Sequence, residues 1–110
     1  MAYRRKSLRK YQIATTTSAI SETVKENDPF DIPWICFKFG SVPDGTDRIK
    51  VYVRSQYGAA YDVLAVNYDP NGKTDIVLPC IASISPADTV EISYANTNGY
   101  SVSGWAVTEL

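Results

Sequence analysis

Short segments in which apolar and polar residues alternate recur along this chain, and this pattern limits the folds that it can adopt. In residues 47–54, DRIKVYVR, every second side chain is apolar: Ile49, Val51 and Val53. Successive side chains of a β-strand point to opposite faces of the sheet, so this segment predicts a strand with one buried and one exposed face. No stretch of the chain has the 3.6-residue period of an amphipathic helix. The sequence therefore indicates an all-β protein.

Several other segments are predicted to be strands. They are residues 33–39, 59–68, 74–80, 81–85, 88–95 and 100–110, and an extended segment within 12–24 adds one more. Residues 59–68, AAYDVLAVNY, are apolar on both faces, which is typical of a central strand. Pro79 is expected to interrupt the ladder between 74–80 and 81–85, because proline has no N–H group to donate. Gly104, in the middle of the last strand, predicts a bulge or a close approach of another strand.

The alternation of apolar and polar residues predicts which side chains of each strand point into the core. In residues 33–39 one side holds Ile35, Phe37 and Phe39, and the other side holds Trp34, Cys36 and Lys38. In residues 88–95 the inward positions are predicted to be Val90, Ile92 and Tyr94.

Turn signals separate the strands. Residues 43–45, Pro-Asp-Gly, form one signal, and residues 69–72, Asp-Pro-Asn-Gly, predict a hairpin turn, because proline presets one dihedral angle and Asn-Gly tolerates positive φ. Short strands at close spacing with such turns are typical of an antiparallel sandwich or barrel. We expect a single antiparallel β-sandwich, jelly-roll or Ig-like, of about seven or eight strands with a basic extended N-terminal arm.

The chain has 110 residues, which corresponds to one domain with one hydrophobic core. We expect residues 1–10 to form the arm and residues 11–110 to form the sandwich. No apolar run approaches ~18 residues, so no transmembrane helix and no membrane association are expected. The polar residues after the basic start do not match a signal peptide, whereas a mitochondrial-type transit peptide stays open, because residues 1–21 hold no acidic residue.

Charge is distributed unevenly along the chain. Five of the 11 basic residues lie within the first ten positions: Arg4, Arg5, Lys6, Arg9 and Lys10. The other 100 residues hold the remaining six basic residues and all 12 acidic residues, a net charge of −6. A basic segment of this kind suits docking on an acidic protein surface or on nucleic acid, or it is a solubilising tail. Because the acidic body would repel phosphates, we favour a protein partner.

Residue types that catalysis or metal binding commonly uses are scarce. The chain has no histidine, which excludes a histidine base and a Ser–His or Cys–His nucleophile pair. Cys36 and Cys80 are interpreted as small buried hydrophobic residues, or as a pair if adjacent strands bring them together. Asp69, Asn71 and Asp75 have a spacing that could offer oxygen atoms to calcium, but turn chemistry explains them. We expect no enzymatic activity, no cofactor and no metal site.

Two further groups of residues are candidates for surface contacts. One occupies alternate positions of a predicted strand: Arg48, Lys50, Tyr52 and Arg54. Its mixture of cations and an aromatic ring suits phosphate and base contacts, but a solvated strand face, or an edge protected by charge, is favoured within an acidic domain. The other group would form a glycan-binding platform if exposed, although core or interface packing explains it as well: Tyr57, Tyr61, Tyr100 and Trp105.

The C-terminal part of the chain, TDIVLPCIASISPADTVEISYANTNGYSVSGWAVTEL, resembles small β-sandwich virion structural proteins of tailed bacteriophages. In such proteins an I.LP strand, a DTVEISY.N strand and a terminal SG.A..EL strand often follow one another. Here these are residues 76–79, 88–96 and 103–110. The likeness covers residues 60–110 and is one of texture, without a diagnostic motif.

The resemblance implies a capsid decoration (cement) protein, or a small head or tail accessory subunit, made in the host cytoplasm and located in the virion. Such proteins bridge shell subunits, often as trimers, and have no catalytic site. The major capsid protein would be the partner, and the basic N-terminal segment would meet the shell. Two alternatives stay open: a glycan- or receptor-binding module of a phage tail or head fibre, and a small jelly-roll coat protein whose arm binds the genome.

Overall fold

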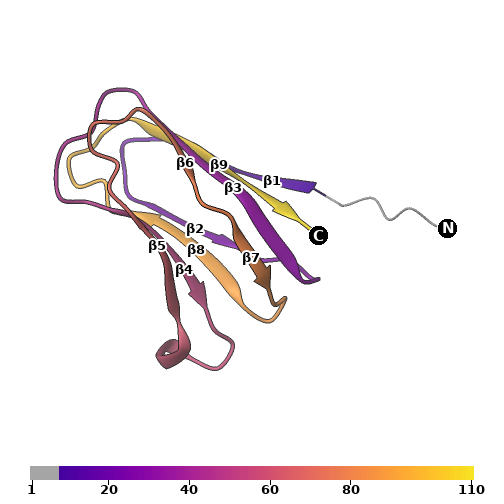
Figure 1. The fold of residues 1–110 in the computed structure, drawn as a ribbon. Coiled ribbons are helices and arrows are strands. Elements are labelled where there is room, and N and C mark those ends of the chain that lie inside the picture. Colours follow the sequence, from indigo (N-terminus) through magenta and orange to yellow (C-terminus); the bar gives the residue numbers. More distant parts are fainter. Residues whose placement is uncertain (1–7) are drawn as a thin grey trace.

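The computed structural model describes residues 8–110, in which nine β-strands form two antiparallel sheets that pack face to face (Figure 1). The strands of sheet A are, in order, β1 (Leu8–Thr16), β9 (Val102–Glu109), β3 (Phe30–Phe39) and β6 (Asp75–Leu78), with β7 (Ile81–Ile84) also paired to β3. The strands of sheet B are, in order, β2 (Ile20–Val24), β8 (Thr89–Tyr94), β4 (Ile49–Arg54) and β5 (Val63–Tyr68). A 3₁₀ turn, η1 (Ala59–Tyr61), precedes β5. The prediction of an all-β antiparallel sandwich is confirmed.

The strand pairs are nested along the chain: β1 with β9, β2 with β8, β3 with β6 and β7, and β4 with β5. A long antiparallel hairpin that is wound into two sheets gives this order, which is that of a jelly roll. Strands β6 and β7 share one position in this order, because both pair with β3 and Pro79 lies between them. The predicted interruption at this proline is confirmed, and it gives this sandwich one strand more than the eight of a jelly roll. The one extended segment expected within residues 12–24 instead belongs to two strands, β1 and β2.

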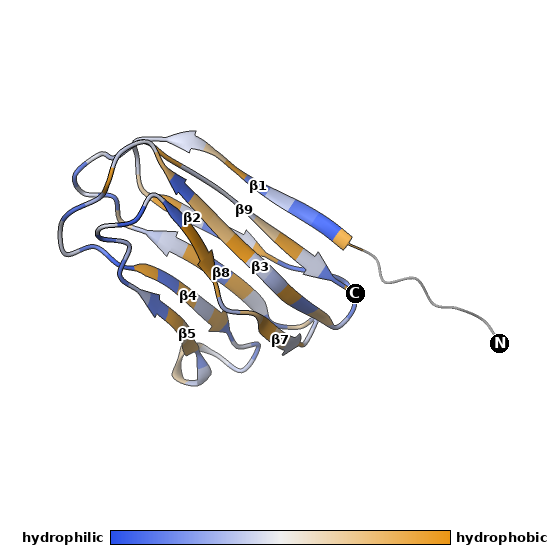
Figure 2. Cartoon of the chain, turned by 45° about the horizontal axis from the view of Figure 1, so that its top comes forward, coloured by the Kyte–Doolittle hydropathy of each residue, from blue (hydrophilic) through white to orange (hydrophobic). Residues whose placement is uncertain are grey.

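The core lies between the two sheets and is formed by alternate side chains of their strands. Figure 2 shows the resulting hydrophobic and hydrophilic bands along the strands. Ile35, Phe37 and Phe39 of β3, and Ile49 and Val51 of β4, are each at most 2% exposed. The inward positions of β8 are buried too, so the predicted facing of all three strands is confirmed. Each large apolar side chain buried in this way contributes about 1.5–3 kcal/mol.

Gly104 lies in β9, beside β3. A Cβ atom at this position would lie 2.7 Å from the carbonyl oxygen of Cys36 and 3.0 Å from the ring of Phe37. Only a residue without a side chain fits here, so the close approach predicted from the sequence is confirmed.

Polar contacts tie together the loops at one end of the sandwich. The Tyr100 hydroxyl accepts a hydrogen bond from the Asp44 N–H at 2.9 Å and donates to the carbonyl of the same residue. Asn96 is buried with a left-handed φ of 49°. Its side chain accepts from the Tyr100 N–H at 2.9 Å and donates to the Ser18 carbonyl at 3.1 Å. These bonds satisfy backbone groups that the loops would otherwise leave unpaired.

Two sequence predictions about strand connectivity are wrong. Residues 59–68 do not form a central strand, because residues 59–61 form η1 and β5 is the edge of sheet B, paired only with β4. Residues 69–72 form a turn, in which the Lys73 N–H donates to the Pro70 carbonyl at 3.2 Å. This turn does not close a hairpin, since β5 and β6 lie in different sheets. Neither local periodicity nor turn chemistry shows which strand will lie beside another.

Candidate interaction surfaces

The described basic residues of the N-terminal segment belong to the sandwich. Arg9 and Lys10 lie in β1, which begins at Leu8 and pairs with β9. Residues 8–10, which the sequence assigned to the arm, therefore lie in a strand of sheet A. The other predicted docking residues of this segment, Arg4, Arg5 and Lys6, lie outside the described residues.

A buried carboxylate holds the start of β1 in place. The side chain of Glu26 is 2% exposed, and one of its oxygens lies 3.5 Å from Nε of Arg9. The same oxygen accepts hydrogen bonds from the Tyr11 hydroxyl at 3.1 Å and from the Thr108 hydroxyl at 3.4 Å. Burial and the nearby carboxylate raise the pKa of Tyr11, because both disfavour the phenolate. Part of the N-terminal positive charge therefore has a structural role.

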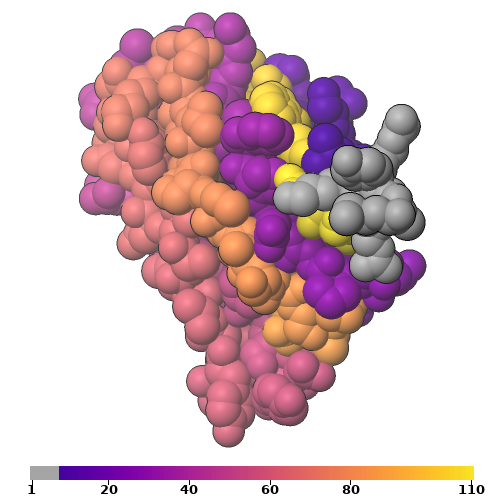
Figure 3. Space-filling view, turned by 45° about the vertical axis from the view of Figure 1, so that its right-hand side comes forward, coloured from indigo at the N-terminus to yellow at the C-terminus, as the bar shows by residue number. Residues whose placement is uncertain are grey.

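The outer face of sheet A carries exposed apolar side chains. Trp34 of β3 is 49% exposed, Trp105 of β9 is 41% exposed and Val77 of β6 is 66% exposed. In the sheet register, Cys36 of β3 pairs with Trp105 of β9 on one side and with Val77 of β6 on the other. The three side chains therefore form one row across three neighbouring strands. Trp34 is two positions from Cys36, on the same face of β3. We call these four residues the tryptophan face. In Figure 3, β6, β3, β9 and β1 lie next to one another on the side that carries it.

Basic side chains border the tryptophan face. Nζ of Lys10 lies 5.8 Å from the centre of the Trp105 ring, within the range of a cation–π contact. Lys38 lies on the same side of β3, and its Nζ is 3.6 Å from an oxygen of Asp75 in an exposed ion pair, a kind of pair that stabilises little. An aromatic surface with cations at its edge suits a partner that is apolar and acidic.

The predicted row of cations on β4 is engaged within the protein. The predicted row consists of Arg48, just before β4, and of Lys50, Tyr52 and Arg54 within β4, all at outward positions of sheet B. Arg54 donates to Glu91 at 2.8 Å and to Asp62 at 3.1 Å, and its guanidinium lies 4.1 Å from the centre of the Tyr52 ring. Arg48 lies 3.6 Å from a carboxylate oxygen of the β5–β6 loop. Two of the three cations thus have acidic partners, and β4 is a central strand rather than a protected edge.

The four aromatic residues of the predicted glycan platform lie in three separate places. Tyr57 and Tyr61 are 75% and 66% exposed on the connection between β4 and β5, with ring centres 6.0 Å apart. Tyr100 is half-buried against Phe39, with ring centres 6.5 Å apart, and its hydroxyl is used by the loops. Trp105 belongs to the tryptophan face on the other sheet. The structure does not bring the four side chains together.

Cys36 and Cys80 are free thiols rather than a disulfide. Cys36 is half-buried, and this burial raises the pKa of its thiol. Cys80 is exposed at the break between β6 and β7, so its interpretation as a buried residue is wrong. The reason is the break itself, since Pro79 ends the strand whose continuation would have packed this side chain.

The loop residues considered for calcium have other partners. The Asn71 side chain donates to the Gly45 carbonyl at 2.6 Å, while its N–H donates to Asp69 at 3.0 Å. Asp75 is paired with Lys38. Within residues 8–110, no group of three or more His, Cys, Asp or Glu side chains could hold a metal ion.

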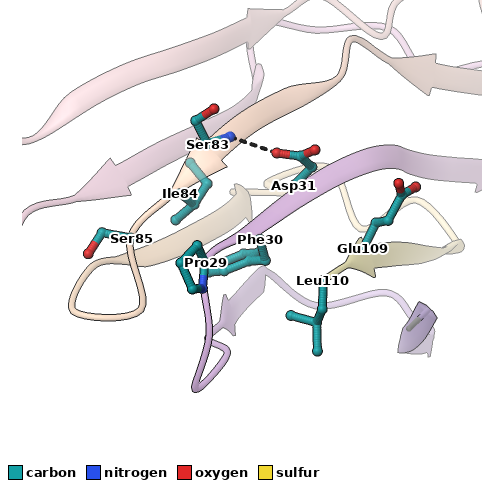
Figure 4. Close-up of a pocket in the computed structure, with 8 residues that line it drawn as sticks. All are labelled: Pro29, Phe30, Asp31, Ser83, Ile84, Ser85, Glu109 and Leu110. Atoms are coloured by element: carbon teal, nitrogen blue, oxygen red, sulfur yellow. Dashed lines mark hydrogen bonds between the residues drawn. The ribbon is translucent and has the colours of Figure 1, made fainter. Parts of the chain in front are cut away.

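A hollow of about 340 Å³ lies where β3, β7 and β9 meet (Figure 4). Asp31 and Glu109 lie opposite each other on β3 and β9, and Ser83 and Ser85 line the other side. The Ser83 N–H donates to Asp31 at 2.7 Å, which fixes that carboxylate. The hollow offers carboxylates and hydroxyl groups, but it does not match the pattern of a nucleophile beside an activating base.

Sequence reasoning selected Trp105 but missed Trp34 and Val77 as members of one surface. The alternation in residues 33–39 did place Trp34 and Cys36 on a common side, which was the available signal. That β9 and β6 flank this part of β3 follows from long-range pairing, which the alternation does not encode.

A scan against protein-family models finds no match for this chain, and a search of the curated proteins finds none either. The resemblance to phage virion proteins therefore stays a prediction. No helix in residues 8–110 has the length and apolar character that crossing a membrane requires. The fold and its surfaces define a jelly-roll domain with an exposed aromatic sheet face.

Proposed function

We propose that this chain is a non-enzymatic virion structural protein, and specifically a capsid decoration subunit that docks on a protein shell through the tryptophan face. The observation that carries the proposal is the exposure of Trp34, Trp105 and Val77 on one face of sheet A. Contiguous apolar patches on soluble proteins commonly mark interaction sites. Tryptophan is also enriched among the residues that dominate the binding energy of interfaces.

The distribution of charge supports an acidic partner surface. Lys10 and Lys38 lie beside the tryptophan face, and the first ten residues of the chain hold five cations and no acidic residue. Cations at the edge of an apolar contact speed association with an acidic surface and select against basic ones. The N-terminal segment and the tryptophan face would thus act on the same partner, a subunit of the shell.

The fold is compatible with this role but does not identify it. Jelly rolls occur in viral capsid domains, in lectins and in cupins, and a fold hosts many functions. The resemblance of residues 60–110 to phage virion proteins favours the first of these settings. A glycan- or receptor-binding module is the second candidate, because two tryptophans exposed on one sheet face also suit sugar rings.

Purified particles provide the test. Mass spectrometry and immunogold labelling should find the chain on virions at a copy number comparable to that of the shell subunits. After mild removal, purified protein should bind again to the stripped particles. The double variant Trp34→Ala/Trp105→Ala should bind at least ~10-fold more weakly, since two such residues at an interface contribute more than ~1.4 kcal/mol together.

The matched control is Val42→Ala, which shortens another exposed apolar side chain, 58% exposed, in the connection between β3 and β4. It should bind as the wild type does. Particles without the chain would contradict the proposal, and equal binding by the tryptophan variant would exclude this face. Binding of the wild type to a glycan array, with none to particles, would favour the second candidate.

A further inference from the structure

The edge strand of sheet B is exposed and apolar. Among the strands of residues 8–110, β5 pairs only with β4, and its sequence, VLAVNY, holds no charged residue. Val63 is 56% exposed, Leu64 is 43% exposed and Ala65 is exposed as well. A strand edge of this kind presents unpaired N–H and C=O groups next to apolar side chains, which favours pairing with another strand.

The other edge strands of the two sheets carry features that oppose pairing. β1 contains Arg9 and Lys10, and β2 contains Glu22. β6 and β7 have only four residues each, β6 begins with Asp75, and Pro79 lies between the two strands. Charge, short length and proline are the common means by which proteins prevent contact between strand edges. Residues 63–68 have none of these three features. Their irregularity is a register shift opposite Val51 and Tyr52, where Ala65 is left without a partner in the β4–β5 ladder.

The connection before β5 enlarges the apolar surface. Tyr57 and Tyr61 are both mostly exposed and contact each other edge to face. The end of the β4–β5 hairpin projects beyond the rest of the sandwich (Figures 1 and 3). The projecting end of the hairpin extends past the facing sheet. Val53, near this end, is therefore only partly buried, whereas Val51 is fully buried.

We propose that β5 pairs with β5 of a second copy of this chain, antiparallel and about a two-fold axis, so that two four-stranded sheets become one continuous sheet of eight strands. The composition of β5 favours this pairing, because an exposed strand edge that carries apolar side chains and no charge is the kind that pairs with another chain.

The charges near β5 also favour pairing with a second copy. A two-fold interface places β5 against itself, and like charges opposite each other would repel, but this strand carries none. The acidic residues at its two ends are already paired, Asp62 with Arg54 at 3.1 Å and Asp69 with Arg48 at 3.6 Å. The net charge of the whole chain is −1, which leaves little repulsion between copies. A partner strand with charged residues would have to bury those charges against the uncharged β5, which costs free energy.

The size of the surface sets the expected strength of pairing. The exposed parts of Tyr57, Tyr61, Val63 and Leu64 amount to a few hundred Å² on each copy, so the total falls below ~1,200 Å². We therefore expect a weak two-fold dimer that forms at high concentration, or where many copies are held on one particle. This inference does not rest on docking through the tryptophan face, which lies on the other sheet.

Sedimentation velocity over the order of 10 µM to 1 mM tests the pairing. The sedimentation coefficient of the full chain should rise with concentration. Ala65→Lys adds a charge to the exposed edge without removing a buried group, and this variant should stay monomeric. Thr23→Lys places the same charge on β2, the opposite edge of the same sheet, and should associate as the wild type does.

Hydrogen exchange of the wild-type protein gives a second measurement that needs no variant. Amides of residues 63–68 should exchange more slowly at high concentration, and those of residues 20–24 should not change. A wild type that stays monomeric over the whole range overturns the proposal, as does Ala65→Lys that folds and still associates. Association with unchanged exchange in residues 63–68 also overturns it, because the contact would then lie elsewhere. The Trp34→Ala/Trp105→Ala variant should keep the dimer, which separates this test from that of particle binding.

Discussion

Gly104→Ala is expected to destabilise the sandwich where it supports the tryptophan face. The new methyl group would lie 2.7 Å from the Cys36 carbonyl oxygen and 3.0 Å from the Phe37 ring. The oxygen belongs to the backbone of β3, and Cys36 is paired with Trp105 in the β3–β9 ladder. It can move only if the two strands shift against each other, so the clash cannot be relieved by a side-chain rotation.

Two opposing effects set the magnitude. Overpacking of a well-packed site costs about 1–3 kcal/mol, whereas replacing glycine by alanine stabilises a strand by about 0.4–1 kcal/mol by restricting the unfolded chain. We expect a net loss of about 1–2 kcal/mol in the free energy of unfolding, with steric overlap as the larger effect. For a domain of this size that corresponds to a fall in Tm of roughly 4–16 °C.

Thermal and urea unfolding, followed by circular dichroism, measure this loss. The control is Ser103→Ala, which changes the neighbouring half-buried residue of β9 on the opposite side of the strand and should stay within ~0.5 kcal/mol of the wild type. If Gly104→Ala were as stable as the wild type or more so, the close approach of β9 and β3 would not be the reason for glycine at this position.

Two further predictions concern β1 and its contacts. Deleting residues 1–10 should lower the free energy of unfolding in urea by about 1–3 kcal/mol more than deleting residues 1–7 does. The reason is that the longer deletion removes Arg9, the ion-pair partner of the buried Glu26. Equal stability of the two deletion variants would refute this. Stability should also fall above pH 10, since the pKa values of Tyr11 and Tyr94 are raised above their usual 10.0, mainly by burial. The folded state then holds these protons more tightly than the unfolded state, so their contribution is complete below pH 10 and is lost as the pH rises through the folded pKa values. In urea unfolding measured at several pH values, Tyr11→Phe should reduce the loss of unfolding free energy with rising pH. An unchanged dependence on pH would show that Tyr11 does not cause this loss.

Much of the fold could be predicted from the sequence, because its signals are local. The alternation in residues 47–54 depends on the geometry of a single strand, and it identified the buried positions Ile49 and Val51. The break at Pro79 and the close approach at Gly104 follow from the chemistry of one residue. The sandwich could be inferred from the number and spacing of such segments, without knowledge of which strands pair.

The candidate surfaces could be predicted only in part. Trp105 was selected for its aromatic ring, but the tryptophan face exists because β3, β9 and β6 are neighbours in one register. Similarly, the cations of β4 were visible in the sequence, whereas the carboxylates of Asp62 and Glu91 that engage Arg54 come from other elements.

The sequence alone thus determined which residues form strands, which of their faces are apolar and where strands are interrupted, since these properties follow from side-chain period and backbone chemistry. The tertiary structure alone decided that β5 is an edge, that residues 69–72 cross between sheets and that Glu26 is buried beneath β1. The physical reason is that strand pairing joins residues far apart in the chain. Its outcome depends on how all the apolar faces are buried together, and no single segment contains that information.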